Sequence, residues 1–133
     1  MAYDVKRKQK MPMDALKIEI DKLAREGGFK AAILANEEGL TVVNIESEYD
    51  NDALAVLAGF LSTSSKRISN LVGFNKVKHM TMTDPEGNTV ICRFFEMFGQ
   101  QVSLGLITRI DPNLFKIADQ AVDTIKSLFS DEG

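Results

Sequence analysis

Apolar residues recur at helical spacing near the start of the chain and predict an amphipathic helix after Pro12. Its apolar stripe lies at Leu16, Ile20 and Leu23, three to four residues apart, and the helix ends at Gly27. This helix should cover one face of a larger element with a single stripe.

A buried hairpin is predicted next. Segment 29–36, FKAAILAN, has apolar residues on both sides of an extended chain, and segment 40–46, LTVVNIE, returns after Gly39. Glycine accepts the positive φ of a tight turn. A strand that is apolar on both sides is covered on both faces of its sheet.

A long helix is predicted over residues 51–73, with Asp50 as its N-cap. It has more apolar positions than one stripe needs. Ala53, Val56 and Phe60 lie beside the main band and widen it. A helix with so broad an apolar arc usually packs against two partners. The main apolar band comprises Leu54, Leu57, Ala58, Leu61, Ile68 and Leu71.

Three further strands follow, and then a last helix. Segment 77–83 alternates, with Met80 and Met82 on one face, where we expect them to belong to the core. The DPEGN sequence is typical of a hairpin turn. Two apolar strands come after it, and Asp111 caps a helix that starts at Pro112.

The order helix, two strands, helix, three strands, helix predicts an α+β fold. We expect a three-layer sandwich, in which a five-stranded antiparallel sheet carries one long helix on one face and two helices on the other. The length of 133 residues suits one domain. We place it at residues 12–130, after a flexible basic extension at 1–11 and before a tail at 131–133.

Composition and charge exclude several classes of protein. The net charge of −3 and the lack of a basic stripe with aromatics argue against nucleic-acid binding. No apolar run approaches the roughly 20 residues that span a bilayer. A single cysteine, Cys92, forms no internal disulfide, so we expect a cytoplasmic protein. A weak contact with anionic surfaces is conceivable at the basic residues of the extension, which are Lys6, Arg7, Lys8 and Lys10.

We find no catalytic or cofactor-binding pattern and expect no enzyme. A phosphate-binding loop is absent, and one His with one Cys is a poor start for a metal site. Cys92 fits a buried structural thiol, and His79 fits a strand residue at a surface or interface. Arg67 and Arg93 are candidate arginine fingers, although a solvated or ion-paired side chain is the simpler interpretation. The hydroxyls and cations of STSSKR, residues 62–67, suit a helix face that accepts small polar residues.

The chain resembles the Roadblock/dynein light chain (Roadblock/LC7) family from about Met13 to Phe129. The matching parts are GGFKAAILANEEGLTVV, DALAVLAGFLSTSSKRISNL, VKHMTMTDPEGNTVICRF and VSLGLIT followed by NLFKIADQAVDTI. Their order and spacing carry the resemblance. The stand-alone form is most similar to the prokaryotic single-domain GTPase regulators of the family.

The resemblance implies a non-enzymatic regulator or scaffold of a small Ras-like GTPase, with GTPase activation as one form of regulation. It also implies a homodimer or heterodimer in which the long helices pack across a two-fold axis and the third strands form one continuous sheet, and we expect the homodimer. The residues expected at this dimer interface are Ala53, Val56, Leu57, Phe60, Ser64, Val77, His79 and Thr81. Those expected to contact another partner are Ser62, Lys66 and Arg67.

Two alternatives remain open at this stage. One is a small-molecule sensor on a profilin-like fold, with Cys92 or His79 lining a pocket. The other is an assembly module that binds an extended peptide along the sheet edge at LTVVNIE.

Overall fold

The computed structural model describes the backbone of residues 2–97 and 99–130, and the side chains of residues 13–97 and 99–128. Within these residues, the helices are α1 (Ala2–Gly27), α2 (Asn51–Val72) and α3 (Leu114–Ser130). The strands are β1 (Ala31–Ala35), β2 (Thr41–Asn44), β3 (His79–Thr83), β4 (Asn88–Met97) and β5 (Gln100–Arg109). The element order is the one that the sequence predicted.

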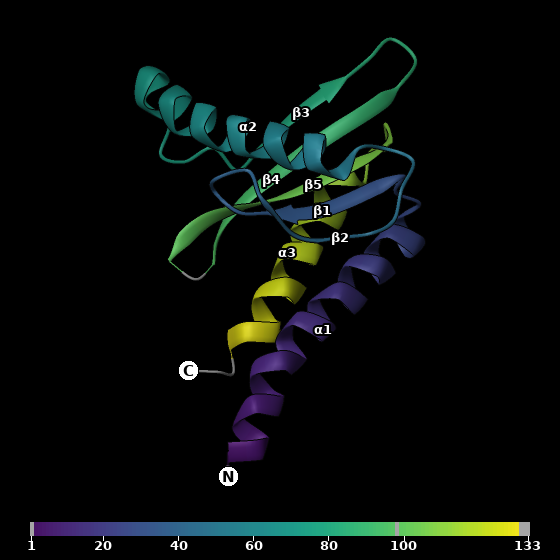
Figure 1. The fold of residues 1–133 in the computed structure, drawn as a ribbon. Coiled ribbons are helices and arrows are strands. Elements are labelled where there is room, and N and C mark those ends of the chain that lie inside the picture. Colours follow the sequence, from purple (N-terminus) through teal and green to yellow (C-terminus); the bar gives the residue numbers. More distant parts are fainter. Residues whose placement is uncertain (1, 98, 131–133) are drawn as a thin grey trace.

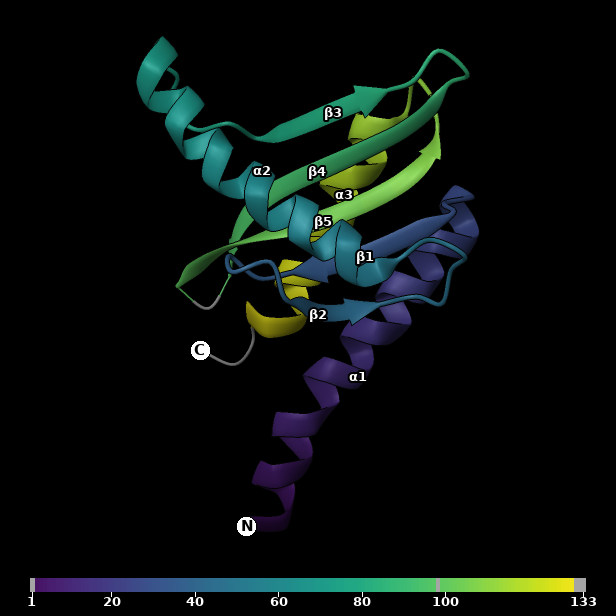
Figure 2. The ribbon, with the colours of Figure 1, turned by 45° about the horizontal axis from the view of Figure 1, so that its top comes forward.

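All five strands form one antiparallel sheet in the order β2-β1-β5-β4-β3. Helix α2 crosses one face of the sheet, and α1 and α3 lie on the other (Figure 1). The predicted α+β three-layer sandwich is therefore confirmed. β2 and β3 are the two edge strands. Helix α2 crosses the sheet obliquely, from above β1 and β2 toward the β3 side (Figure 2).

The sheet separates two hydrophobic clusters. One lies under α1 and α3 and includes Leu16, Ile20 and Leu104, while the other lies under α2 and includes Ile33 and Leu54. All five residues of β1 are buried, because its side chains alternate between the two clusters. The prediction of a hairpin strand covered on both faces is correct for β1.

The turn between β1 and β2 is fixed by an asparagine that the sequence pattern did not single out. The Asn36 side chain accepts hydrogen bonds from the backbone N–H groups of Glu38 and Leu40, each at 3.0 Å. Gly39 has a φ of +85°, as the turn requires. This compact turn lies directly beside α2.

Helix α1 begins at Ala2, well before the expected start after Pro12. A proline removes one amide donor from a helix, and here it does not end it. The first turns of α1 project past the sheet (Figure 1). The side chains of residues 1–12 and the backbone of residues 131–133 lie outside the described part, so the flexible extension, its contact with anionic surfaces and the tail stay predictions.

Two apolar residues expected in the core lie at the surface instead. Leu71 is 84% exposed, because the end of α2 projects beyond the edge of the sheet (Figure 2). Met82 is 46% exposed, because β3 is an edge strand and α2 packs mainly on β1 and β5. Met80 is half-buried and packs against the cluster under α2.

Candidate partner-binding surface

Helix α2 starts where the sequence predicted, and one side of it packs on the sheet. The Asp50 side chain accepts a hydrogen bond of 3.1 Å from the N–H of Ala53, which caps the helix. Leu54, Ala58 and Leu61 are buried against the sheet. The outward side remains apolar in its first half.

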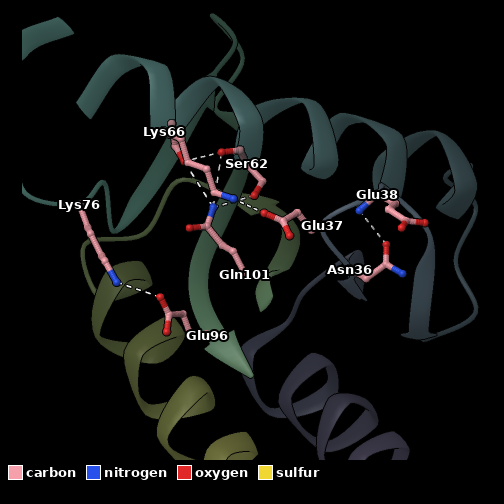
Figure 3. Close-up of polar contacts among 9 residues, drawn as sticks. Asn36, Glu37, Glu38, Ser62, Lys66, Lys76, Glu96 and Gln101 are labelled. Atoms are coloured by element: carbon pink, nitrogen blue, oxygen red, sulfur yellow. Dashed lines mark hydrogen bonds and ion pairs between the residues drawn. The ribbon is translucent and has the colours of Figure 1, made fainter. Parts of the chain in front are cut away.

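The flank of α2 that faces β1 and β2 is closed by contacts within the chain. A side chain at Gly59 would place its Cβ 2.7 Å from the Cα of Gly39, so the helix and the turn meet at two glycines. Further along the helix, Lys66 forms an ion pair with Glu37 of the same turn (Figure 3). No partner is needed on this flank.

The opposite flank faces β3 and is open. Leu57 is half-buried against the cluster under α2, against which Val77 and Met80 also pack. Beyond it, Val56 and Phe60 are 64% and 68% exposed. These values far exceed those of side chains that pack inside one domain. The predicted second apolar arc of this helix therefore exists, and within the described chain nothing covers it.

A polar network lies beneath the second half of α2 (Figure 3). Gln101 Nε2 donates hydrogen bonds to Ser62 Oγ at 2.6 Å and to Ser65 Oγ at 3.5 Å. The Ser65 and Ser69 hydroxyls each donate to a carbonyl oxygen earlier in the helix. The sequence pattern missed this network, since serines and a glutamine on different elements show no shared period.

The network corrects one expected partner contact. Ser62 is fully buried on the side of α2 that faces the sheet and is hydrogen-bonded to Gln101, so it does not reach the surface. Lys66 is exposed but has its partner in Glu37. Arg67 is exposed on the outward side of the helix. Of the three residues expected to contact a second partner, Arg67 is therefore the one best placed to do so.

Strand β3 has a free edge. The carbonyl oxygen of Lys78 accepts from Phe94, and the N–H of Asp84 donates to Asn88, both at 2.9 Å. In an antiparallel ladder the bonding residues alternate, so Met80 and Met82 also bond to β4. The backbone groups of His79, Thr81 and Thr83 therefore point away from the sheet. Unpaired edge groups of this kind are a template for another strand.

His79 lies on the opposite face of the sheet from α2. Its ring stacks on Phe115 of α3, with centroids 4.3 Å apart. Burial lowers the pKa of His79, and Lys78 and Arg93 add to that effect while Asp119 opposes it. The expectation of a strand histidine at a surface fits this placement.

Asp119 links α3 to the sheet through ion pairs with two neighbouring cations. It accepts from Lys78 Nζ at 2.8 Å and from Arg93 Nε at 2.9 Å, and these hydrogen bonds lower its pKa. Arg93 is thus an ion-paired residue. Cys92 is fully buried, and burial raises the pKa of its thiol to about 12, which suits a structural thiol.

Neither a metal site nor a membrane span is found in the described residues. No group of three or more metal-binding side chains comes together there. None of the helices described is both long and apolar enough to cross a membrane.

The fold of this chain is similar to folds seen in solved structures of other proteins. No protein-family model and no curated protein sequence matches the chain. Among solved structures, MglB from Myxococcus xanthus matches with a TM-score of 0.74 and 16% identity, covering 88% of this chain and 96% of that one. A Roadblock/LC7 domain from Streptomyces avermitilis matches with a TM-score of 0.69 and 15% identity, covering 84% and 92%. The chain has the Roadblock/LC7 fold.

A third structure agrees with this assignment. The gliding protein MglB from Thermus thermophilus matches with a TM-score of 0.73 and 16% identity, covering 92% of this chain and 93% of that one. The resemblance to the Roadblock/LC7 fold that the sequence indicated is confirmed at the level of structure. At such identities the likeness extends to the fold and leaves binding residues to be read from this chain.

The residues expected at the dimer interface lie on α2, on β3 and just before β3, and they differ in exposure. Ala53, Val56 and Phe60 are exposed on α2, and Thr81 is exposed on the free strand edge. Leu57, Ser64, Val77 and His79 are half-buried. Leu71 and Met82 are exposed as well. Sequence reasoning assigned both to the core, since a pattern does not show where a helix or strand extends beyond the element that covers it.

Proposed function

We propose that this chain is a non-enzymatic cytoplasmic protein that forms a homodimer and regulates or scaffolds a small Ras-like GTPase. The observations that carry the proposal are the exposed apolar side of α2 and the free edge of β3. Val56 and Phe60 are more than half exposed, and the β3 edge has unpaired backbone groups at Thr81. A second copy of the chain covers both at once.

The GTPase part of the proposal follows from the fold. Members of the family that the chain resembles are chiefly regulators and scaffolds of small GTPases, and MglB shares the fold with this chain. The chain need not supply an arginine finger. Arg93 is held by Asp119. We assign the protein a role in reshaping the switch regions of the GTPase, which needs no catalytic group from this chain.

Peptide binding along β2, one of the two alternatives, is not favoured by the contacts at that edge. Lys17 Nζ of α1 donates a 2.7 Å hydrogen bond to the carbonyl oxygen of Asn44, which already occupies part of that edge. The small-molecule alternative has no support from the residues proposed for it. Cys92 is enclosed by core side chains, and the His79 ring lies against Phe115.

The test begins with the mass of the purified protein by light scattering, alone and mixed with small Ras-like GTPases loaded with GTP or GDP analogues. We expect a dimer that binds the GTP form. A monomer that binds none of these GTPases would leave the fold without this function.

Phe60→Glu tests the dimer surface directly. Burying an unpaired carboxylate costs several kcal/mol, so we expect this variant to be a monomer with unchanged helical content by circular dichroism. Gln120→Glu is the control, because Gln120 is exposed on α3, on the other face of the sheet, and this change should leave the mass unchanged. An unchanged mass for Phe60→Glu would place the dimer contact elsewhere.

A further inference from the structure

A polar hollow opens between the second half of α2, the loop that leads to β3 and the start of β5. Its volume is about 380 Å³, which is within the range of small-molecule sites. Such sites usually have mainly apolar walls. Here Val77 is the one apolar side chain among the described residues that line the hollow. The hollow therefore suits a small and strongly polar molecule.

The floor of the hollow offers hydrogen-bond acceptors whose own hydrogens are already in use. Ser65 and Ser69 line it and are 2% and 8% exposed. The Ser69 hydroxyl donates to the carbonyl oxygen of Ser65 at 3.0 Å, and the Ser65 hydroxyl donates to that of Ser62 at 2.7 Å. Both hydroxyl oxygens are therefore left to the hollow as acceptors.

Gln101 adds a further acceptor to this floor. Its Nε2 donates to the Ser62 and Ser65 hydroxyls, so its amide oxygen points away from Ser62 (Figure 3). Within the described chain, no donor reaches this oxygen or Ser69 Oγ. A ligand group that carries several N–H hydrogens would satisfy both acceptors.

Two ion pairs stand at the mouth of the hollow. Lys66 pairs with Glu37, and Lys76 Nζ lies 2.9 Å from Glu96 Oε1 (Figure 3). All four side chains are more than one-third exposed. Ion pairs in such positions contribute little to stability, because water competes for both charges. The mouth can therefore rearrange around a charged ligand.

The balance of charge at the mouth is positive. The hydrogen bond from Lys76 lowers the pKa of Glu96, and the charges of Lys126 and Lys66 lower it further. Three lysines thus act in a place where Glu37 and Glu96 supply two carboxylates. An anionic ligand group complements this excess of positive charge.

We propose that this hollow binds a small zwitterion of the amino-acid class, with its ammonium group at the floor and its carboxylate at the mouth. The ammonium donates to Ser69 Oγ and Gln101 Oε1, and the carboxylate accepts from Lys66 and Lys76. An ammonium has donors only and a carboxylate has acceptors only, which matches the two ends of the hollow. A plain anion would leave the floor acceptors unpaired, and a plain amine would leave the positive mouth unpaired.

Nuclear magnetic resonance titration with the common L-amino acids, added one at a time at millimolar concentration, tests the site. The site needs neither a GTPase nor a second copy, so the ¹⁵N-labelled chain is used alone. We expect at least one amino acid to shift the amide signals of Ser69 and Gln101 in a saturable way. If none of them does so, the proposal is overturned.

Derivatives of the amino acid that binds separate its two ends. The N-acetyl form lacks the ammonium, and the primary amide form lacks the carboxylate. Each should bind at least roughly tenfold more weakly, since each loses a charged hydrogen-bonding group. Unchanged affinity of the N-acetyl form would indicate a site for anions, and unchanged affinity of the amide form would indicate a site for amines. Either result would overturn the zwitterion.

Two variants assign the ends of the ligand to residues. Ser69→Ala should lower the affinity for the amino acid about tenfold and leave that for its N-acetyl form unchanged. Lys76→Gln should lower the affinity for the amino acid by a similar factor and leave that for its amide form unchanged. Circular dichroism confirms that each variant is folded, and Lys76→Gln changes an exposed side chain only.

Lys30→Gln is the matched control for Lys76→Gln. Lys30 is exposed at the opposite end of the sheet, where the next residue, Ala31, pairs with Ile107. This variant should bind the amino acid as the unchanged chain does. Equal affinity in Ser69→Ala, Lys76→Gln and Lys30→Gln would overturn the proposed site.

Discussion

Gly59 is the residue at which α2 comes closest to the β1–β2 turn, and its missing side chain sets that distance. An added Cβ would lie 2.7 Å from the Cα and 2.9 Å from the N of Gly39, and backbone atoms have no rotamer with which to move away. Gly39 in turn needs its positive φ of +85° for the hairpin. Each glycine is therefore required for a different reason.

Gly59→Ala should destabilise the protein despite alanine's better helix propensity. We expect overpacking against Gly39 to outweigh a propensity gain of about 1 kcal/mol, with a net loss of about 1–2 kcal/mol. Urea unfolding measures it. Thr63→Ala is the control on an exposed face and should not lose stability. A Gly59→Ala variant as stable as the parent would show that the turn moves away without cost.

The single histidine, His79, should lower the free energy of unfolding below neutral pH. Burial holds the pKa of His79 below its ordinary 6.5, so the folded chain resists protonation more than the unfolded chain does. The stabilisation is present above pH 6.5 and decreases as pH falls through 6.5 toward the folded pKa. The carboxylate that faces His79, Asp119, has a lowered pKa and stays ionised in this range.

The measurement is urea unfolding at about pH 7.5 and about pH 5.5, on either side of the ordinary histidine pKa, with His79→Gln as the control. We expect the parent to lose stability between these values, while His79→Gln shows a smaller change. If the free energy of unfolding changed equally with pH in both proteins, the Phe115 ring and the cations around His79 would not determine the titration.

Among the elements, β3 differs from β2 in what its edge offers. Its odd-numbered residues carry backbone groups that point outward, while the even-numbered ones bond to β4. A proline is tolerated at an edge position whose N–H faces away from the sheet. The two kinds of position therefore separate pairing between copies from folding of one copy.

Thr81→Pro should give a folded monomer, since it removes an outward N–H and a site for strand pairing. Met80→Pro is the control and should unfold the β3–β4 pair, because that N–H faces β4. Light scattering and circular dichroism separate the two results. A Thr81→Pro variant that stays dimeric would show that the strand edge takes no part in the association.

Helix and strand order could be predicted because each element has a clear period and a clear end. Asp50 capped α2 and Gly27 ended α1 as expected. The position of an element relative to its neighbours has no such signal. The sequence pattern put Leu71 and Met82 in the core, although both lie where an element extends past its cover. Ser62 and Gln101 meet only in three dimensions, so their bond was not foreseen.

At the scale of the whole molecule, the sheet divides the protein into two unequal halves. Helices α1 and α3 enclose one face together, whereas α2 alone crosses the other (Figure 1). A single helix leaves apolar side chains such as Phe60 and Met82 uncovered on its side. The part of the expected interface that belongs to α2 is exposed for a simple reason: this half has one covering helix fewer.

The bond between Lys17 and Asn44 has a consequence for how large an assembly can grow. A sheet extends without limit only if each added unit presents a fresh edge, as in a fibre. Here α1 reaches over and occupies a carbonyl of β2, so this end of the sheet resists addition. When two copies join at β3, both ends of the joined sheet are β2 strands. The Lys17 contact would therefore oppose growth of the proposed dimer beyond two copies through its β2 edges.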